Sequence, residues 1–493
     1  MKTSKKVISL LLSVIMLVTT FAVAAPFMTF AADIEINGVS QTRIVGTDGS
    51  YETTYAKYAA EFLNGHSEPT DIVIPGLDSG DDYVTQGMAY YPQKDWMLIT
   101  AYHGNTAKAA TANPSMVFCI DNSTGEFVAM FSFKNIDGTP NTDHGGGIAI
   151  SDHNIYYACG DKDRKIAYAP LSALDGIEND ASKYREIQLV GERDFYEIGS
   201  VTKSSKTAYT AYVCYDQGIL WTGNFYDEGA VLGFIAADYN APANDAANSM
   251  VWGYELSGNS SAEEWANLTS GTTDCQGNPS YVITLSDNIK DVQYAVVDNG
   301  KIYISQSYGT GKGTMSTSVG GMDDYSHLTI ADIDLSVPGN KTVTFNTDAN
   351  GNTRTVNDAY HISWYQTFDF MPMSEGLCVI NDYVFMTFES ATYKYLEKAG
   401  VMGNCQMPVD VVWKMDQHAL MGEERPADCK SMYYEKVTAL SQIEDGEEYM
   451  ILFESAEKDP VTQNKYLYAL SSNGGFRDYK LAKRYATGSE GYA

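Results

Sequence analysis

The sequence feature that most constrains the fold is a recurring pair of apolar runs joined by a short polar turn. The clearest copies are "TQGMAYYPQKDWMLITAYH", which begins at Thr85, and "SEGLCVINDYVFMTFESA", which begins at Ser374. Other copies begin at Gly146, Ala211, Val292 and Leu440. Each copy precedes a third strand-like run, and Gly, Asn and Asp turns separate the runs. The recurrence predicts an all-β fold made of repeated sheets.

The paired runs are apolar on both faces, which is the pattern of a sheet that is covered on each side by a neighbouring sheet. Radially stacked sheets supply such covering and protect strand edges. We therefore expect a single β-propeller of six blades, with five blades plus a C-terminal hairpin as the alternative. Successive copies are 60 to 82 residues apart, which exceeds the usual ~40–50 residues of a blade. The surplus is expected to form loops.

The chain opens with MKTSKK and a long apolar run, which together predict a secretory signal peptide over residues 1–31. A retained membrane anchor is the alternative. Residues 32–80 form an N-terminal segment with a helix in "SYETTYAKYAAEFLNG". Either "DIVIPGL" (71–77) or "FRDYKLA" (476–482) is expected to complete the last blade of the propeller, which spans 81–493. We expect a secreted, monomeric protein with no membrane span after cleavage.

Charge limits the class of partner. The chain has 33 basic and 63 acidic residues, a net charge of −30. This excess disfavours nucleic acid and anionic membranes, which select clustered Lys and Arg. Attraction of cations such as calcium is compatible with it. The chain has seven cysteines and no CxxC motif that would indicate zinc. A disulfide between Cys405 and Cys429 is one available pairing.

The first strand of each propeller blade lines the central channel, so its opening residue lies near one rim. Gln86, Gln293 and Glu375 occupy equivalent opening positions and carry side-chain oxygens. Convergent oxygens are what calcium selects, so these three residues form the predicted metal site. The alternative is a channel lined by polar residues and filled with water. The full set of predicted ligand-binding residues is Gln86, Asp143, His144, Gln293, Gln306, Glu375 and Glu389.

The hairpin at 374–391 contains two of these candidates. A two-residue turn at Asn381-Asp382 predicts that residue 375 pairs with 388, and residue 374 with 389. Glu375 and Glu389 then lie at one end but on opposite faces, and a bulge would be needed to make them an acid–base pair. The phrase FESA recurs around Glu454, which favours a structural role for Glu389. Ends of second strands, such as Tyr102-His103, are expected to share this rim.

The stretch "DHGGGIAI" at 143–150 is the densest local motif. Three glycines allow the backbone to pass another group closely. His144 is a candidate base or metal ligand, and the alternative is a tight entry into a strand. His144 and Glu375 are the candidate catalytic residues.

Residues 85–127 resemble an opening blade of glutaminyl-cyclotransferase-like propellers, and the blade phrases are similar to the SMP-30/gluconolactonase and paraoxonase families. The matching residues build blades, so the resemblance implies the fold and no catalytic residue. Two functions follow as hypotheses. One is an exported binding protein for an extracellular glycan, peptide or small molecule. The other is a calcium-assisted hydrolase or lactonase with its site at the channel mouth.

Overall fold

The computed structural model describes most of the chain beyond the predicted signal peptide. The described residues are 34–46, 51–62, 66–78, 80–104, 113–159, 165–194, 210–223, 250–268, 279–286, 289, 291–307, 325–346, 353–362, 364–396, 405, 407–422, 450–458, 465–471 and 485–486. The signal peptide and Cys429 lie outside these residues. Within them, no helix is long and apolar enough to cross a membrane.

Five antiparallel sheets, here called blades 1 to 5, make up the repeated part of the fold. Blade 1 contains β4 (Tyr83–Tyr91), β5 (Trp96–His103), β6 (Met116–Asp121) and β7 (Phe127–Lys134). Blade 2 contains β8 (Gly147–Ile150), β9 (Asn154–Ala158), β10 (Lys165–Pro170) and β12 (Gly191–Asp194). Blade 3 contains β13 (Tyr212–Asp216), β14 (Ile219–Gly223), β15 (Met250–Glu255) and β16 (Tyr281–Leu285). Blade 4 contains β17 (Val292–Asp298), β18 (Lys301–Gln306), β19 (Ser326–Asp332) and β22 (Gln366–Phe370). Blade 5 contains β23 (Ser374–Ile380), β24 (Tyr383–Phe388), β25 (Val411–Asp416) and β3 (Ser67–Val73).

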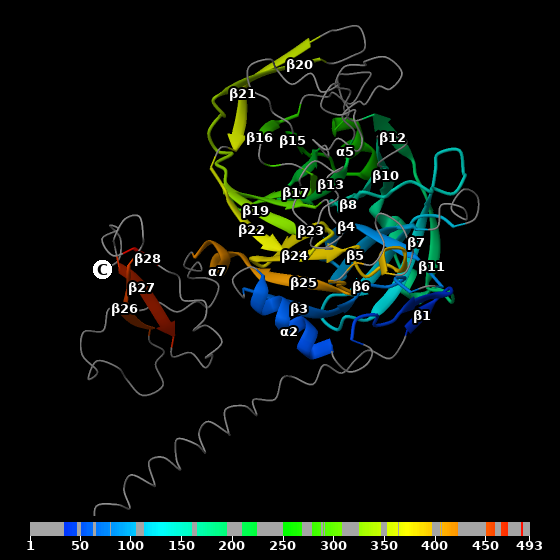
Figure 1. Ribbon diagram of the computed structural model, residues 1–493. Coiled ribbons are helices and arrows are strands. Elements are labelled where there is room, and N and C mark those ends of the chain that lie inside the picture. Colours follow the sequence, from blue (N-terminus) through cyan, green and yellow to red (C-terminus); the bar gives the residue numbers. More distant parts are fainter. Residues whose placement is uncertain are drawn as a thin grey trace, which may run out of the picture. The chain divides into compact units, whose positions relative to one another are not determined.

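The first strands of the blades touch one another in a closed cycle. β4 contacts β8, β8 contacts β13, β13 contacts β17, β17 contacts β23, and β23 contacts β4 again. Figure 1 shows these five strands gathered at the centre of the sheets, with the last strands of the blades farther out. The chain is therefore a five-bladed β-propeller, and the prediction of that fold is confirmed.

The predicted number of six blades is corrected to five, the alternative that the sequence left open. The sixth copy of the repeat forms a separate sheet of β26 (Met450–Lys458), β27 (Lys465–Ser471) and β28 (Tyr485–Ala486). Because β23 already packs against β4, the ring closes after the fifth copy. The pattern of apolar runs predicts the hairpin in each copy, but it does not predict how many copies enter the ring.

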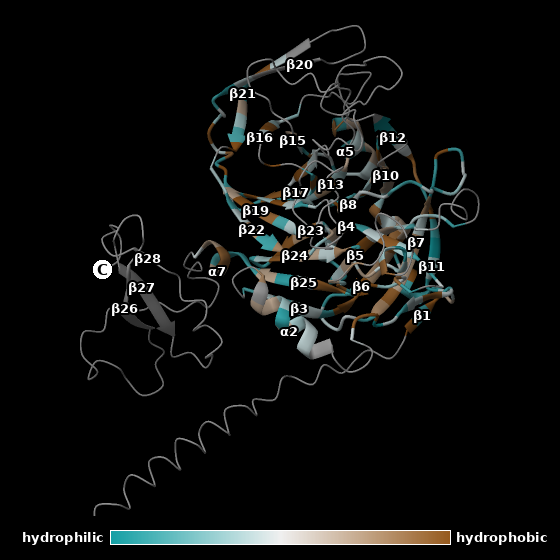
Figure 2. Cartoon of the chain, in the orientation of Figure 1, coloured by the Kyte–Doolittle hydropathy of each residue, from teal (hydrophilic) through white to brown (hydrophobic). Residues whose placement is uncertain are grey.

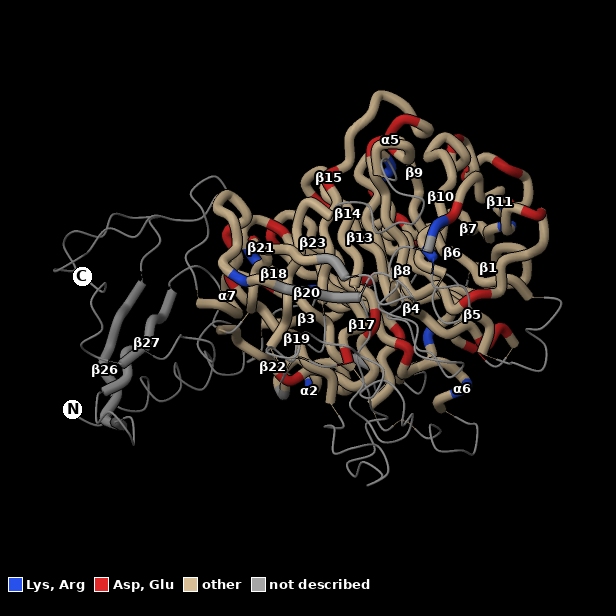
Figure 3. The backbone as a smooth tube through the Cα atoms, turned by 90° about the horizontal axis from the view of Figure 1, so that it is seen from above, with Lys and Arg blue, Asp and Glu red and all other residues tan. Residues whose placement is uncertain are grey.

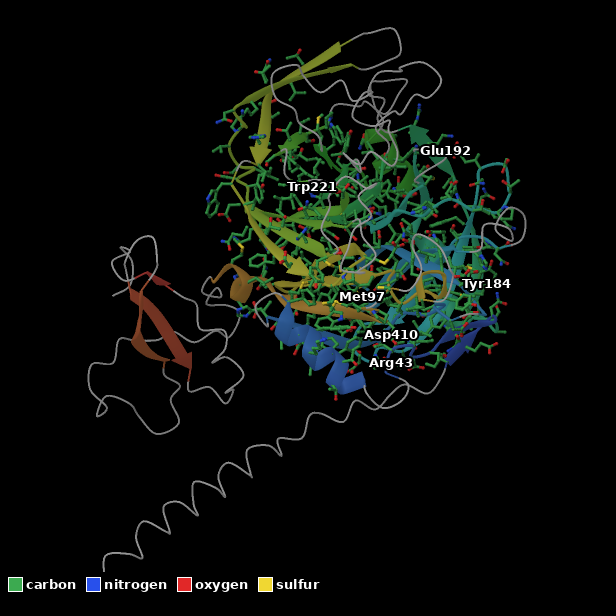
Figure 4. All side chains as sticks on the ribbon, viewed as in Figure 1. Arg43, Met97, Tyr184, Glu192, Trp221 and Asp410 are labelled. Carbon is green, nitrogen blue, oxygen red and sulfur yellow. The ribbon has the colours of Figure 1, made fainter. Side chains whose placement is uncertain are left out.

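The N-terminal segment completes the last blade. Strand β3 pairs antiparallel with β25, so the two ends of the ring belong to one sheet. Buried Asp410 ties this segment down, because its carboxylate accepts hydrogen bonds from the backbone N–H groups of Ile44 (2.6 Å) and Val45 (2.7 Å) and from the hydroxyl of Tyr55 (2.6 Å). Arg43 lies 3.7 Å from the same carboxylate (Figure 4).

Short elements surround this framework. Tyr55 belongs to α2 (Tyr51–Glu61), which lies within the predicted helical stretch, and its buried ring packs edge-on against Trp413. The other elements are β1 (Ile34–Ile36), β2 (Val39–Gln41), α5 (Ser261–Leu268), α6 (Tyr393–Leu396), α7 (Gln417–Met421) and the 3-10 helices η2 (Leu171–Leu174) and η3 (Ile177–Asn179).

Part of the surplus length that was expected to form loops forms extra strands. β11 (Tyr184–Gln188) leaves blade 2 between its third and fourth strands and pairs parallel with β7 of blade 1. β21 (Thr353–Ile362), with its partner β20 (Lys341–Asn346), leaves blade 4 at the same place and pairs parallel with β16 of blade 3. Each excursion covers the outer edge of the preceding blade, which a parallel strand protects from unwanted pairing.

The core lies between the blades, as the two-sided apolar pattern requires. Leu98 and Phe131 of blade 1 pack with Ile155 and Tyr157 of blade 2, and all four side chains are buried. A second cluster joins blade 2 to blade 3 in the same way. Figure 2 shows the hydrophobic colouring concentrated on the blade strands. Burial of these side chains supplies the main stabilising free energy of the fold, at about 25 cal/mol per Å² of apolar surface.

The centre of the ring is filled rather than open. The hydroxyl of Tyr294, on β17, lies 3.0 Å from the carbonyl oxygen of Met88, 3.1 Å from that of Ile148 and 2.5 Å from that of Val213. These carbonyls belong to blades 1, 2 and 3, so one buried side chain joins four blades. The glycine run at 145–147 serves the same close packing, because a Cβ on Gly147 would lie 2.3 Å from the backbone nitrogen of Val213.

Candidate rim site

Three of the innermost strands bulge at the positions where the sequence places a polar opening residue. The ladder of β4 with β5 shifts by one residue at Gln86-Gly87, and that of β23 with β24 shifts at Glu375-Gly376. The ladder of β17 with β18 shifts at Gln293. A bulge adds one residue to a strand and turns a side chain away from its regular direction.

Threonines on the second strands support two of these bulges. The hydroxyl of Thr100 accepts a hydrogen bond from the backbone N–H of Gly87 (2.7 Å) and donates to the carbonyl of Gly145 (2.7 Å). The hydroxyl of Thr387 lies 3.4 Å from the carbonyl oxygens of both Gln86 and Gly376. Backbone groups that the irregular ladder leaves unpaired thereby find partners, which buried polar groups require.

The predicted register of the 374–391 hairpin is correct near the turn and wrong at its far end. Ile380 pairs with Tyr383 as expected, but Ser374 pairs with Phe388. The one-residue bulge accounts for the difference. A regular ladder would place Glu375 and Glu389 on opposite faces, but here the charge of Glu389 raises the pKa of Glu375.

The amide of Gln86 joins this pair from blade 1. Its Nε2 atom lies 3.3 Å from Oε2 of Glu389 and donates a second hydrogen bond to the carbonyl of Thr85 at 2.7 Å. Gln86 and Glu375 are only 5% and 4% exposed, whereas Glu389 is partly exposed. Solvent therefore reaches the site through Glu389.

A segment that the sequence analysis missed supplies two further side chains. Immediately after β24 the chain forms the short helix α6, which carries Lys394 and Tyr395. The hydroxyl of Tyr395 donates to Oε2 of Glu389 at 3.0 Å. The ammonium of Lys394 lies 2.8 Å from the hydroxyl of Tyr102 and over the rings of both tyrosines. The only sequence signal was the position of "TYKYL" directly after the FESA phrase.

His144 reaches the site through an aromatic stack. Its ring lies on that of Tyr102 with centroids 4.3 Å apart and planes inclined by 27°. Both side chains are partly exposed. We call the following residues the rim cluster: Gln86, Tyr102, His144, Glu375, Glu389, Lys394 and Tyr395.

Burial changes the protonation of the two acids. Burial raises the pKa of Glu389 to about 7, although the charge of Lys394 and the hydrogen bonds from Tyr395 and Gln86 lower it. The pKa of Glu375 is raised well above its usual range by burial and then by the charge of Glu389, with Lys394 opposing the rise. Near neutral pH the pair therefore keeps a proton, as close carboxyl groups do when they cannot both ionise.

The three remaining predicted residues have hydrogen-bond partners outside this cluster. Gln293 donates to the carbonyl of Ser307 at 3.1 Å, and Gln306 accepts from the hydroxyl of Thr329 at 2.6 Å. The carboxylate of Asp143 accepts from the amide of Asn141 at 3.0 Å. The structure thus brings Gln86 into contact with Glu389 and places Glu375 within the influence of the Glu389 charge, while His144 joins through its stack on Tyr102.

Among the described residues, no group of three or more His, Cys, Asp or Glu side chains is arranged to hold a metal ion. Gln293 bonds within its own blade. The calcium site predicted at Gln86, Gln293 and Glu375 stays a prediction.

Comparisons with known proteins give no family for the chain. No family model and no curated protein matches the chain. Similar solved structures include BamB from Moraxella catarrhalis, with 11% identity, a TM-score of 0.23, and coverage of 70% of this chain and 91% of that one. The WD40 β-propeller domain of Doa1 has 9% identity, a TM-score of 0.26, and coverage of 68% and 94%.

A tail fibre of Staphylococcus aureus phage P68 has 10% identity, a TM-score of 0.32, and coverage of 84% of this chain and 74% of that one. Scores this low carry no argument about function. They also give no support to the finer resemblance to the gluconolactonase, paraoxonase or glutaminyl-cyclotransferase groups.

Proposed function

We propose that this chain is an exported ligand-binding protein that holds an extracellular glycan on the rim cluster. The observation that carries the proposal is the Tyr102–His144 stack beside Lys394 and the Glu389 carboxyl group. An aromatic face suits the apolar side of a sugar ring. The neighbouring ammonium, amide and carboxyl groups supply donors and acceptors for its hydroxyls.

Charge favours a neutral ligand over an anionic one. The cluster contains two carboxyl groups and one ammonium, and the whole chain carries a net charge of −30. A hydroxyl can donate to Glu389 when that group is ionised and accept from it when it is protonated. A neutral polyol therefore remains a suitable partner over the range in which Glu389 titrates, with a pKa of about 7.

An array of neutral and acidic glycans, followed by calorimetry with any that bind, tests the proposal. We expect a neutral glycan to bind, Tyr102→Ala to weaken its affinity at least tenfold, and Glu389→Gln to weaken it several-fold. Glu126→Gln, which changes an exposed acid on the loop before β7, is the control and should bind normally. Absence of binding across the array, or equal binding by Tyr102→Ala, would reject the glycan site.

A second function is favoured by the bulge that brings Glu375 and Glu389 together. Two coupled carboxyl groups of raised pKa can divide the work of hydrolysis. Glu375, which holds its proton more strongly, would protonate a leaving group, and ionised Glu389 would accept a proton from the attacking water. This version of the hydrolase hypothesis relies on no calcium.

Turnover distinguishes the two functions. Chromogenic glycosides and lactones should be hydrolysed by the native chain and by Glu126→Gln, but not by Glu375→Gln, if the pair is catalytic. Binding of a glycan without release of product would support the binding protein and exclude hydrolysis of that ligand.

A further inference from the structure

A cavity lies on the far side of the Tyr294 hydroxyl from the rim cluster. It has a volume of about 180 Å³, and residues on or next to the innermost strands of all five blades line it. They include Tyr90 of blade 1, Asp152 of blade 2, Asp216 of blade 3, Val296 of blade 4 and Leu377 of blade 5. The cavity is thus built by the ring itself rather than by one loop.

Tyr294 separates this cavity from the rim cluster. Its hydroxyl contacts carbonyls at residues 88, 148 and 213 of the first three blades. On these three strands the cavity is lined by residues at or beyond those positions, namely 88–90, 92–93, 150–152 and 214–217. Gln86 and Gly146 precede them. A ligand in the cavity therefore does not touch the rim cluster.

The lining combines an apolar floor with acidic walls. Met88, Val296 and Leu377 supply buried apolar surface, and Asp152 and Asp216 supply carboxyl groups. No Lys, Arg or His is among the residues that line the cavity. An anionic ligand would be repelled by the two carboxylates and would find no cationic side chain in this lining, so it is disfavoured.

Asp216 has one carboxylate oxygen that lacks a hydrogen-bond donor. Its Oδ2 atom is buried without a hydrogen-bond partner, and its carboxyl group lies against that of Asp298. Asp298 is 6% exposed, and its two oxygens accept from Gln217 (2.8 Å) and Asn299 (3.3 Å). A buried oxygen without a donor is costly, and a cationic donor would relieve that cost.

The geometry points to a binding site for a small primary ammonium ion with a short apolar body, whose NH₃⁺ group donates to Asp216 and whose carbon chain lies on Met88, Val296 and Leu377. An ammonium has three donors and no acceptor, which matches the unpartnered carboxylate oxygen of Asp216. The excess of acidic residues over the chain, visible in Figure 3, favours the approach of cations.

Calorimetry of the whole chain with n-butylammonium tests this proposal, with 1-butanol and butyrate as probes of equal carbon number. We expect n-butylammonium to bind and the other two to show at least tenfold weaker binding. Asp216→Asn should lower the affinity for n-butylammonium at least tenfold. Glu375→Gln, in the rim cluster, should leave its affinity unchanged, so the outcome is independent of the rim site.

Two further variants keep the test decisive. Val379→Phe narrows the cavity from a partly exposed position on β23 and should abolish binding even if Asp216→Asn does not fold. Glu126→Gln removes one negative charge from an exposed position outside the cavity and should bind n-butylammonium as tightly as the native chain does. If n-butylammonium binds no better than 1-butanol, or if Val379→Phe retains full affinity, the proposal is overturned.

The pH dependence gives an additional readout. Burial, followed by the charge of Asp298, raises the pKa of Asp216 to about 8. The other titratable groups in the lining are Tyr90, Asp152, Cys214, Tyr215 and Cys378. Because an ammonium needs the ionised carboxylate, its affinity should fall by roughly tenfold per pH unit below pH 8. A flat affinity between pH 6 and pH 8 would contradict the role of Asp216.

Discussion

The backbone N–H of Glu389 donates to the carbonyl oxygen of Met373 at 3.0 Å. In the regular hairpin expected from the sequence, residue 389 would lie opposite residue 374. The shift by one residue is the mark of the bulge at Glu375-Gly376. The bulge makes neighbours of two acids in one hairpin, so we expect the stability of the protein to depend on pH.

Stability should fall as pH rises from about 5 to 8 because of the Glu375–Glu389 pair. Both groups have a raised pKa when folded, so the folded state binds more protons than the unfolded state in this window. The linkage relation then makes the free energy of unfolding decrease with pH. Glu389→Gln removes one of the two titrating groups. The change that it causes in the free energy of unfolding should be more favourable at pH 8 than at pH 5 by about 1–3 kcal/mol.

Urea unfolding of both chains at several pH values measures this difference. The difference between the native chain and Glu389→Gln does not contain the contribution of other acids whose pKa is raised on folding, such as Asp216. A constant difference between the native chain and Glu389→Gln across the range would show that the pair is not coupled to folding.

Gly376→Ala should destabilise the propeller by about 1–3 kcal/mol, because its Cβ would lie 2.4 Å from the backbone nitrogen of Met88. Gly138→Ala is the matched control, since it has a positive φ of 84° but nothing within 4 Å of the added carbon. The control should cost about 1 kcal/mol from backbone strain alone. Equal effects in urea unfolding would mean that β23 can move away from β4.

Tyr294→Phe should lower the free energy of unfolding by roughly 1–3 kcal/mol, because three buried carbonyls share the lost hydroxyl. Tyr294→Ala would leave a cavity at the centre and cost about 3–5 kcal/mol, by analogy with other truncations of large buried rings. Chemical denaturation measures both. A Tyr294→Phe variant as stable as the native chain would indicate that these carbonyls find other donors.

Asp410→Ala should detach the N-terminal segment from blade 5 and destabilise the fold by about 3–5 kcal/mol, since buried donors and Arg43 lose their partner. Asp369→Ala removes a carboxylate that is 71% exposed and pairs with His327, so it should cost less than about 1 kcal/mol. Limited proteolysis measures whether the N-terminal segment has detached, because a detached segment is cleaved faster. Loss of stability without faster cleavage before residue 67 would argue against the clamp.

Several features of this protein followed from the sequence alone. Apolar runs on both faces of each hairpin require sheets covered on both sides, and the turn at Asn381-Asp382 fixes the nearby register. The polar opening residues Gln86, Gln293 and Glu375 were also visible, and each marks a bulge. These features depend on neighbours in the chain, so local pattern is enough to detect them.

Only the tertiary structure decided the rest. Ring closure at five blades depends on how β23 packs against β4, and these strands are nearly 300 residues apart. The contact between Gln86 and Glu389, 303 residues apart, arises from the same closure. The bulge shifts the register of β23 against β24 by one residue and turns a side chain to a new direction. The sequence Ser-Glu-Gly-Leu at residues 374–377 does not predict it. The rim cluster exists because a closed ring brings the first and last blades together, and that is a property of packing rather than of any local sequence.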